Sequence, residues 1–419
     1  MNRVLIMLFL LIISPIVIGQ ATLITEGKVV NNSQTGSWEG ENISRNEPVT
    51  FIFRNNSITS VNTSGYMLQA GDESPVATNN NLDGQVITGN KLLWNGVNSS
   101  NVITHGLFAG YNINSVIKYN YLDKVPYGII FKSGTNDGTN MTFTQGGAAY
   151  NIWKNGKFGG RVKGINGVRF LNNTFYSGDG LGWYLLLITA NMDRTIPSPS
   201  IGTKVFNNIF YATSNIPMIK IESSCLNGFE SDYNIFFSTA GEPVFEIDNE
   251  TVTWDEWRAL GYDEHSLIMD PDFINTATLI PRSRLDFGKN LGEEWQTGLS
   301  IAASWIAGSP PATANQDSTW QVGAYVHESD EPPLPENTEA LKIFPNPNKG
   351  RFTIEFAEPP ERRDFSIISK TGAKVYDGII YEGERSKELD LSFLHLNPGP
   401  YILVITGNGG RQTKKIILH

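Results

Sequence analysis

Two lysines fall at matching places in two successive segments of the sequence, with an arginine close to one of them. When GIIFKSG (residues 128–134) and GRVKGIN (160–166) are aligned on their lysines, Lys132 lies over Lys163, and Arg161 lies two residues before Lys163. Side chains two residues apart on a β-strand point to the same face, so the three cations would share one surface. Adjacent positive charge lowers the pKa of a lysine and makes it a usable base, while further cations stabilise a neighbouring carboxylate and developing enolate. The chemistry that these residues could perform is β-elimination beside a uronate.

The same alignment continues into two further segments. LLLITAN (185–191) and MIKIESS (218–224) place Thr189 and then Glu222 in line with the two lysines. Stacked strands lie about 4.8 Å apart, and lysines at that distance repel each other unless they face water or an anion. We therefore expect an exterior face. The residues expected to contact a substrate there are Asp179, Trp183, Asp193, Arg194 and Glu222.

Two other interpretations of this face stay open. Cations on an outer strand face can serve only solubility and the protection of sheet edges. An inverting glycosidase instead needs two carboxyl groups about 6.5–9.5 Å apart, and the candidates, none with diagnostic spacing, are Asp123, Asp137, Asp179, Asp193 and Glu222. Trp153, Trp183 and Tyr184 would offer sugar-stacking surfaces if they face outward.

A repeat in the sequence indicates which elements position these residues. An asparagine before an apolar or aromatic pair recurs at Asn56, Asn90, Asn120, Asn151, Asn173, Asn208 and Asn234. The successive spacings are 34, 30, 31, 22, 35 and 26 residues. Unequal units with this minimum fit the coils of a right-handed parallel β-helix, in which extra residues form loops. Asparagines stacked at one corner would pair their amides from coil to coil.

With its LNNTFY and FNNIFY motifs, the sequence over residues 22–327 resembles the pectate-lyase-like superfamily of β-helices. The order GIIFKSG, GGRVKG, VRFLNNTFYSG also resembles the KS, LRHG, NxF order of alginate- and chondroitin-type β-helix lyases. That resemblance implies that Lys132 is the Brønsted base and that Arg161 or Lys163 takes the role of the family's arginine. The sequence departs from the pattern in two ways. Asp123 lies too far back to match the family's acidic calcium ligands, and Gly164 follows Lys163 where the family has a histidine.

The N-terminus and the bulk composition indicate export. Residues 1–19 combine a basic start, an apolar run and small residues before a cleavage point, as a secretory signal peptide does. No other apolar run approaches the ~20 residues that cross a bilayer. The net charge of −10 argues against a nucleic-acid partner. Cys225 is the only cysteine, so no intrachain disulfide can form.

Residues 20–327 are assigned to the β-helix with a C-terminal cap. TVTWDEWRALG (251–261) has the start and stop signals of a helix. Such a cap would cover the open sheet edge of the last coil. The piece from Pro281 to Trp320 fits no usual ending and stays unplaced.

The C-terminal part predicts a second domain. The acidic, proline-rich residues 328–340 are typical of a solvated linker. Residues 341–419 alternate with period 2 between turn signals, which predicts a small antiparallel β-sandwich. The ordered motifs FPNP, SKTGAKV, LNPGPYIL and KKIIL resemble the type A C-terminal sorting domain of the Bacteroidetes type IX secretion system. The resemblance implies an address that the secretion machinery reads at the outer membrane. An Ig-like adhesion or carbohydrate-binding module is the alternative.

The expected fold is all-β: a right-handed parallel β-helix followed by a small antiparallel β-sandwich. The expected function is that of a secreted lyase-like enzyme cleaving a uronate-containing polysaccharide. The alternatives are a glycoside hydrolase on the same scaffold and a non-catalytic glycan-binding or adhesion protein. The sequence requires no cofactor, although the TNDGTN (135–140) and SGDG (177–180) loops could hold Ca²⁺. The expected partners are the polysaccharide and the type IX machinery, with no transmembrane anchor and a monomeric chain.

Overall fold

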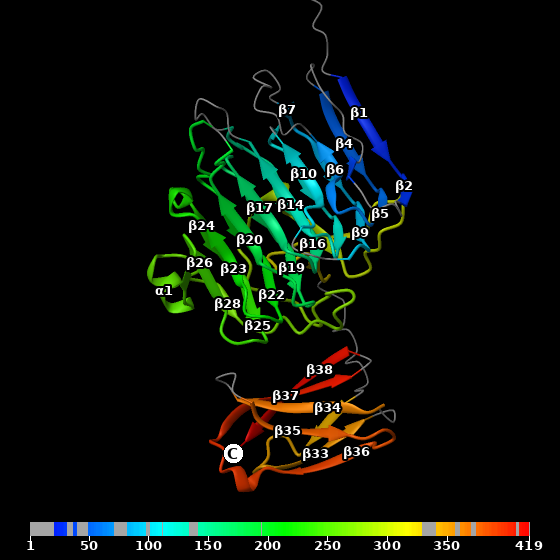
Figure 1. Ribbon diagram of the computed structural model, residues 1–419, viewed down its shortest axis with the longest axis vertical. Coiled ribbons are helices and arrows are strands. Elements are labelled where there is room, and N and C mark those ends of the chain that lie inside the picture. Colours follow the sequence, from blue (N-terminus) through cyan, green and yellow to red (C-terminus); the bar gives the residue numbers. More distant parts are fainter. Residues whose placement is uncertain are drawn as a thin grey trace, which may run out of the picture.

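The computed structural model describes most of the chain, and Figure 1 shows its strands in sequence colours. The described ranges are 21–31, 37–39, 49–70, 82–97, 101–110, 112–133, 141–193, 195–328, 341–356, 361–369, 374–407 and 410–418. The predicted signal peptide and nearly all of the predicted linker lie outside these ranges. None of the described helices is long and apolar enough to cross a membrane.

Three sheets of stacked strands form the N-terminal domain, and each coil contributes one strand to each sheet in turn. Sheet A contains β1 (Ala21–Glu26), β4 (Val49–Arg54), β8 (Val86–Thr88), β12 (Val116–Lys118), β15 (Gly147–Ala149), β18 (Arg169–Leu171), β21 (Lys204–Phe206) and β24 (Glu230–Asp232). Sheet B contains β2 (Val29–Asn31), β5 (Ser57–Ser60), β9 (Lys91–Trp94), β13 (Tyr121–Asp123), β16 (Ile152–Lys154), β19 (Thr174–Ser177), β22 (Ile209–Ala212), β25 (Ile235–Ser238) and β28 (Leu267–Ile268).

Sheet C completes each coil and carries the predicted cations. It contains β3 (Ser37–Glu39), β6 (Ser64–Ala70), β10 (His105–Gly110), β14 (Tyr127–Lys132), β17 (Phe158–Lys163), β20 (Tyr184–Thr189), β23 (Pro217–Ile221), β26 (Val244–Ile247) and β27 (Glu250–Val252). Apart from the last pair, β26 with β27, neighbouring strands of this sheet are parallel. A further short pair is formed by β7 (Leu82–Asp83) and β11 (Asn112–Ile113). The predicted right-handed parallel β-helix is confirmed.

The corner between sheets A and B is built by the predicted asparagines. The Nδ2 of each donates to the Oδ1 of the next, from Asn56 through Asn234, over 2.8–3.1 Å. The residue before each ladder asparagine has a left-handed backbone, with φ between 51° and 67°: Asn55, Gly89, Tyr119, Tyr150, Asn172, Asn207 and Tyr233. This conformation turns the chain sharply within one residue and is uncommon outside glycine and asparagine. The ladder satisfies the buried polar groups that such a corner leaves without a partner.

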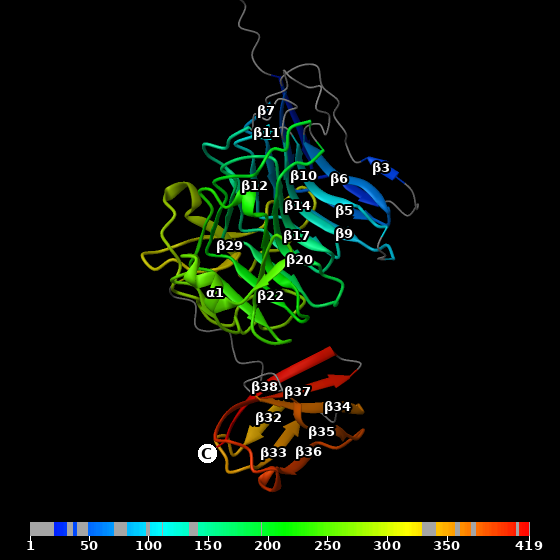
Figure 2. The same ribbon diagram turned by 60° about the vertical axis from the view of Figure 1, so that its left-hand side comes forward.

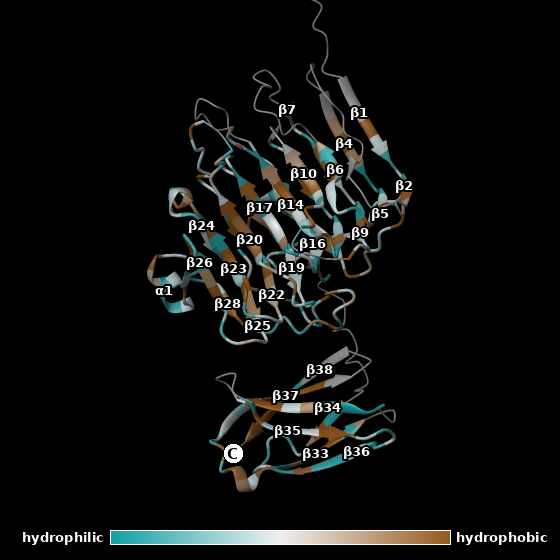
Figure 3. Ribbon diagram, in the orientation of Figure 1, coloured by the Kyte–Doolittle hydropathy of each residue, from teal (hydrophilic) through white to brown (hydrophobic). Residues whose placement is uncertain are grey.

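The interior is filled by side chains stacked in register. The rings of Phe175, Phe210 and Phe236 stack on successive coils with centroids 5.3 and 5.2 Å apart. Strands such as β14 and β20 are largely hydrophobic in colour (Figure 3). Strands buried on the inside and partly covered on the outside need such apolar runs.

A cap closes the last coil, as predicted. Helix α1 (Trp254–Ala259) begins at a capping box between Thr253 and Glu256, and its Trp257 ring stacks on Phe245 at 4.5 Å. Just beyond, Asp263 accepts a hydrogen bond from the last ladder asparagine, Asn234, at 2.9 Å. Asp263 is fully buried, and this burial raises the pKa of its carboxyl group. An aspartate therefore ends the ladder, a role that the repeat pattern did not indicate. The 3-10 helix η1 (Ser223–Cys225) lies before the cap.

The piece that the sequence left unplaced belongs to a long strap, residues 269–327, which runs back over the outside of the asparagine corner. It contains η2 (Glu293–Trp295), β29 (Thr297–Ser300), β30 (Thr313–Asn315) and β31 (Tyr325–Val326). Trp295 and Trp320 pack against Tyr150, Leu171 and Phe206. Further on, the N–H of Gly308 donates to the carbonyl of Asn55 at 2.9 Å, in an early coil. Figure 2 shows this segment, with β29 labelled, along one side of the coil stack.

The C-terminal domain is the predicted antiparallel sandwich. One sheet contains β32 (Leu341–Phe344), β33 (Arg351–Phe356) and β36 (Ser386–Asp390), and the other contains β35 (Lys374–Ile380), β34 (Arg363–Ser369), β37 (Gly399–Gly407) and β38 (Gly410–Leu418). The 3-10 helix η3 (Ser392–Leu394) follows β36. The two sheets share one apolar core that includes Ile354, Ile367 and Leu403.

Candidate functional site

The outer face of sheet C holds the predicted cations in the predicted register. Lys132 on β14 pairs with Lys163 on β17, which pairs with Thr189 on β20. The neighbouring row runs from Ile130 through Arg161, Leu187 and Lys220 to Glu246. Register follows the interior pattern, because a slip by one residue would turn every apolar side chain outward.

Asp193 joins the two lysines from the segment that follows β20. Its Oδ2 lies 2.5 Å from the Nζ of Lys163 and 3.6 Å from the Nζ of Lys132. Asn191 holds this segment, since its Oδ1 accepts from the N–H of Asp193 at 3.1 Å and its Nδ2 donates to the carbonyl of Ser133. The Asp193 side chain is 53% exposed, whereas those of Lys163 and Lys132 are 13% and 15% exposed. One exposed carboxylate therefore covers two largely shielded ammonium groups.

Burial and the hydrogen bond to Asp193 shift the pKa of Lys163 in opposite directions. Burial lowers the pKa of Lys163, and the positive charges of Arg161 and Lys132 lower it further, while the hydrogen bond to Asp193 raises it. The net direction is downward. The same hydrogen bond holds the pKa of Asp193 below its usual value of 3.8.

Arg161 lies between the lysine pair and an aromatic surface. Its guanidinium carbon is 6.0 Å from the centroid of the Phe158 ring, and its buried Nε has no hydrogen-bond partner among the described residues. Burial lowers the pKa of this guanidinium, and the charges of Asp193 and Glu222 partly offset that effect. A buried donor without a partner is costly and is ready to bind an acceptor from a ligand. The Oε2 of Glu222 itself accepts from the N–H of Ala190 at 2.8 Å.

A row of rings beside the cations was not identified from the sequence. It contributes one ring from each strand in register, in the order Tyr66, His105, Tyr127, Phe158 and Tyr184. The rings of Tyr127 and Phe158 stack at 4.3 Å, and His105 lies 4.8 Å from Tyr66. The signal was present in the sequence, because these residues occupy one position of the aligned segments. Phe158 is buried and the other four rings are half-buried, so those four could present ring edges or faces to sugar rings.

The two predicted tryptophan platforms differ. Trp183 is 42% exposed, next to the aromatic row, with the Lys157 Nζ 4.7 Å from its ring centroid and the Tyr127 ring 6.4 Å away. Trp153 is fully buried in the core, so it does not meet the condition of facing outward and offers no surface to a sugar. Alternate residues of a strand point to opposite faces of the sheet. Trp153 occupies an inward-facing position on β16.

The remaining predicted residues are not gathered at this cluster. Asp179 is exposed, and its Oδ1 accepts from the N–H of Leu181 in its own turn at 3.1 Å. Asp123 lies on β13 of sheet B, away from the cations. Arg194, Asp137 and the TNDGTN loop lie outside the described residues. Within the ranges that are described, no group of three His, Cys, Asp or Glu side chains could hold a metal ion.

The C-terminal domain has a known counterpart. Residues 342–419 match the family described as the secretion system C-terminal sorting domain. This domain is a type IX sorting domain. It marks the chain for export to the cell surface or the medium and for handling by the secretion machinery. No curated protein matches the chain. The sorting-domain match covers none of the β-helix, so the activity of the β-helix has to be argued from the geometry of sheet C.

Proposed function

We propose that the outer face of sheet C binds a uronate-containing polysaccharide and cleaves it by β-elimination. The observation that carries the proposal is the cluster of Lys132, Lys163 and Arg161 on two adjacent strands, next to a row of mostly half-buried rings. The aromatic row would stack sugar rings along the sheet. The cations would hold a carboxylate of the sugar at the reacting position.

Asp193 supports this assignment of the anion site. Its carboxylate occupies the place where both lysines can reach one anion. Because Asp193 is exposed and its segment lies outside the strand, a substrate carboxylate could take over its contacts. Arg161, with a buried Nε lacking a partner, would donate the further hydrogen bond that the enolate needs as negative charge develops.

In the proposed reaction, a neutral lysine removes the C5 proton of the uronate. The electrons of the C–H bond form the C4=C5 double bond, the C4–O bond breaks, and the departing oxygen takes a proton. The base is therefore one of the two lysines, and the other stays cationic. The resemblance noted in the sequence assigns the base to Lys132. The lowered pKa of Lys163 makes Lys163 the competing candidate, because a base must be neutral at the working pH.

Binding without cleavage is the second candidate function. The 2.5 Å contact with Asp193 partly offsets the lowering of the Lys163 pKa by burial, and the protonated form that it favours binds anions but removes no proton. A hydrolase has less support on this face. Asp193 has a lowered pKa, and a general acid needs a raised one.

The test is incubation of the full chain with polyuronates, following the ultraviolet absorbance of unsaturated sugar ends. β-Elimination gives that absorbance, hydrolysis gives reducing ends without it, and a binding protein gives neither. In an active protein, Lys132→Ala and Lys163→Ala are compared by turnover and by polyuronate affinity. The variant that loses turnover by about 10²-fold or more while keeping most of its affinity identifies the base. Equal turnover in the wild-type protein and both variants would remove the lysines from the mechanism.

A further inference from the structure

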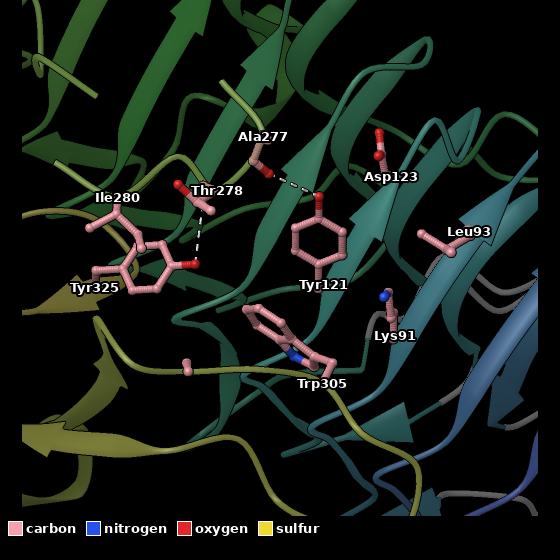
Figure 4. A pocket seen from close by; sticks show the side chains of 10 residues that line it. Lys91, Leu93, Tyr121, Asp123, Ala277, Thr278, Ile280, Trp305 and Tyr325 are labelled. Carbon is pink, nitrogen blue, oxygen red and sulfur yellow. Dashed lines mark hydrogen bonds between the residues drawn. The ribbon is translucent and has the colours of Figure 1, made fainter. Parts of the chain in front are cut away.

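A second candidate site lies on sheet B, under the strap, and has no part in the proposed elimination. Figure 4 shows this cavity from close by. It has a volume of about 370 Å³ and lies between strands β9 and β13 and the strap. Sites for small molecules typically measure about 300–1,000 Å³, so the cavity has room for one small ligand.

One wall of the cavity is aromatic and rigid. The rings of Tyr121 and Trp305 lie 5.0 Å apart at an angle of 41°. A hydrogen bond to a backbone carbonyl fixes each ring. Trp305 Nε1 donates to the carbonyl of Tyr119 at 2.7 Å, and the Tyr121 hydroxyl donates to the carbonyl of Ala277 at 3.3 Å. A third ring, Tyr325, donates to the carbonyl of Thr278 at 3.1 Å. Rings fixed in this way lose little conformational entropy when a ligand binds.

Two polar groups at the cavity, one oxygen of Asp123 and the ammonium group of Lys91, lack partners among the described residues. The Oδ1 of Asp123 is buried without a hydrogen bond, and its Oδ2 lies 3.7 Å from the Nζ of Lys154. Lys91, across from it, makes no side-chain hydrogen bond or ion pair with the part of the chain that the structure describes. A buried carboxylate oxygen without a donor is unfavourable, and a ligand hydroxyl would relieve it.

We propose that this cavity binds a single uncharged sugar residue, such as the end of a glycan chain. The apolar face of the sugar would stack on Trp305 or Tyr121, the Oδ1 of Asp123 would accept from a hydroxyl, and Lys91 would donate to another oxygen. Within the described part of the chain, the Oδ1 of Asp123 lacks a donor and the ammonium group of Lys91 lacks an acceptor, which suits a ligand with several hydroxyl groups. The carboxylate of a uronate would lie close to the Asp123 carboxylate and be repelled by it. The ligand of this cavity therefore differs in charge from the uronate proposed for sheet C.

The test is saturation-transfer NMR and calorimetric titration of the full chain with the methyl glycosides of glucose, galactose, mannose, N-acetylglucosamine and glucuronic acid. We expect binding of at least one uncharged glycoside. Asp123→Asn, which keeps the side-chain shape, should weaken it about tenfold, as expected for a lost hydrogen bond to a charged group. Lys91→Met provides a second substitution with a similar stem. Glu230→Gln is the matched control, because Glu230 is an outward carboxylate on sheet A paired with Lys204.

The proposal is overturned if no uncharged glycoside binds, if Asp123→Asn and Lys91→Met both leave the affinity unchanged, or if the glucuronide binds more tightly than the uncharged sugars. An unchanged thermal unfolding midpoint in the variants shows that the loss is local. Failure here would leave the elimination at sheet C untouched, because the two sites share no residue.

Discussion

The Oδ2 of Asp193 lies 2.5 Å from the Nζ of Lys163, so the most exposed carboxylate of the candidate site is bonded to one of its least exposed cations. The bond has opposite consequences for its partners. It lowers the pKa of Asp193 and so keeps this carboxylate ionised. It also raises the pKa of Lys163, which opposes the lowering caused by burial. Asp193 therefore controls how much free positive charge this face offers to an anionic polymer.

Replacement of Asp193 by asparagine should strengthen polyuronate binding. It frees two lysines that now share one carboxylate. We expect a several-fold lower Kd at low salt, shrinking as salt rises, because exposed charges are screened. Calorimetric titration at two ionic strengths measures it. Glu230→Gln makes the same charge change and frees Lys204 on sheet A. An equal gain in that control would show that net charge, and not this site, is responsible.

The same pair should contribute to stability in a defined pH range. The folded-state pKa of Asp193 lies below its usual value of 3.8, so its contribution is present above that value and is lost as the pH falls through the folded-state pKa. Because the side chain is more than half exposed, the contribution should stay within about 1 kcal/mol. Denaturant unfolding of wild-type and Asp193→Asn proteins should differ near pH 6 and converge as the pH falls below 3.8 and through the folded-state pKa. A difference that is constant with pH would contradict this assignment.

The asparagine ladder should be a large source of stability. In Asn151→Ala, the backbone N–H of Asn120 loses its acceptor, the Nδ2 of Asn120 loses one of three acceptors, and the carbonyl of Ile117 loses a donor. The buried N–H without an acceptor and the other lost hydrogen bonds should together cost about 2–5 kcal/mol in the free energy of unfolding. Asn290→Ala removes an exposed asparagine and should change it by less than about 0.5 kcal/mol. Equal effects in chemical denaturation would mean that the ladder is dispensable.

The strap should hold to the coils mainly through its tryptophans. Trp295 is 4% exposed and packs on Tyr150, whose hydroxyl donates to the carbonyl of Trp295 at 2.6 Å. Trp295→Ala should cost about 3–5 kcal/mol through the cavity it leaves. Hydrogen exchange should show the strap opening before the coils, because its contacts are fewer. Trp183→Ala, just before β20 of sheet C and 42% exposed, is the control, and it should leave strap exchange unchanged.

The C-terminal domain should be transferable. Residues 329–419, fused behind a reporter with a secretory signal peptide, should direct the reporter to the surface or medium of cells that have the type IX machinery. Without the domain the reporter should stay in the periplasm. Fractionation followed by immunoblotting measures the distribution. Export of the shortened reporter would show that the address lies elsewhere.

Much of the fold was predictable because the coils repeat. The spacing from Asn151 to Asn173, 22 residues, is short enough to define one coil, and the ladder then aligns every other coil with it. In-register stacking makes a position in one coil predict the position in the next. The pairing of Lys132 with Lys163 followed from that alignment alone. The sorting domain was recognisable because its turn motifs occur in a set order within residues 342–419.

The sequence by itself determined the coils, their register and the export address. Only the tertiary structure showed that Asp193 contacts two lysines and that Trp153 is buried while Trp183 is partly exposed. It also showed that the strap covers sheet B and forms the cavity at Asp123. The physical reason is that strand positions obey a local repeat, enforced by burial of one face. Segments between the strands differ in length from coil to coil, and their contacts are set by packing against parts of the chain that no local pattern identifies.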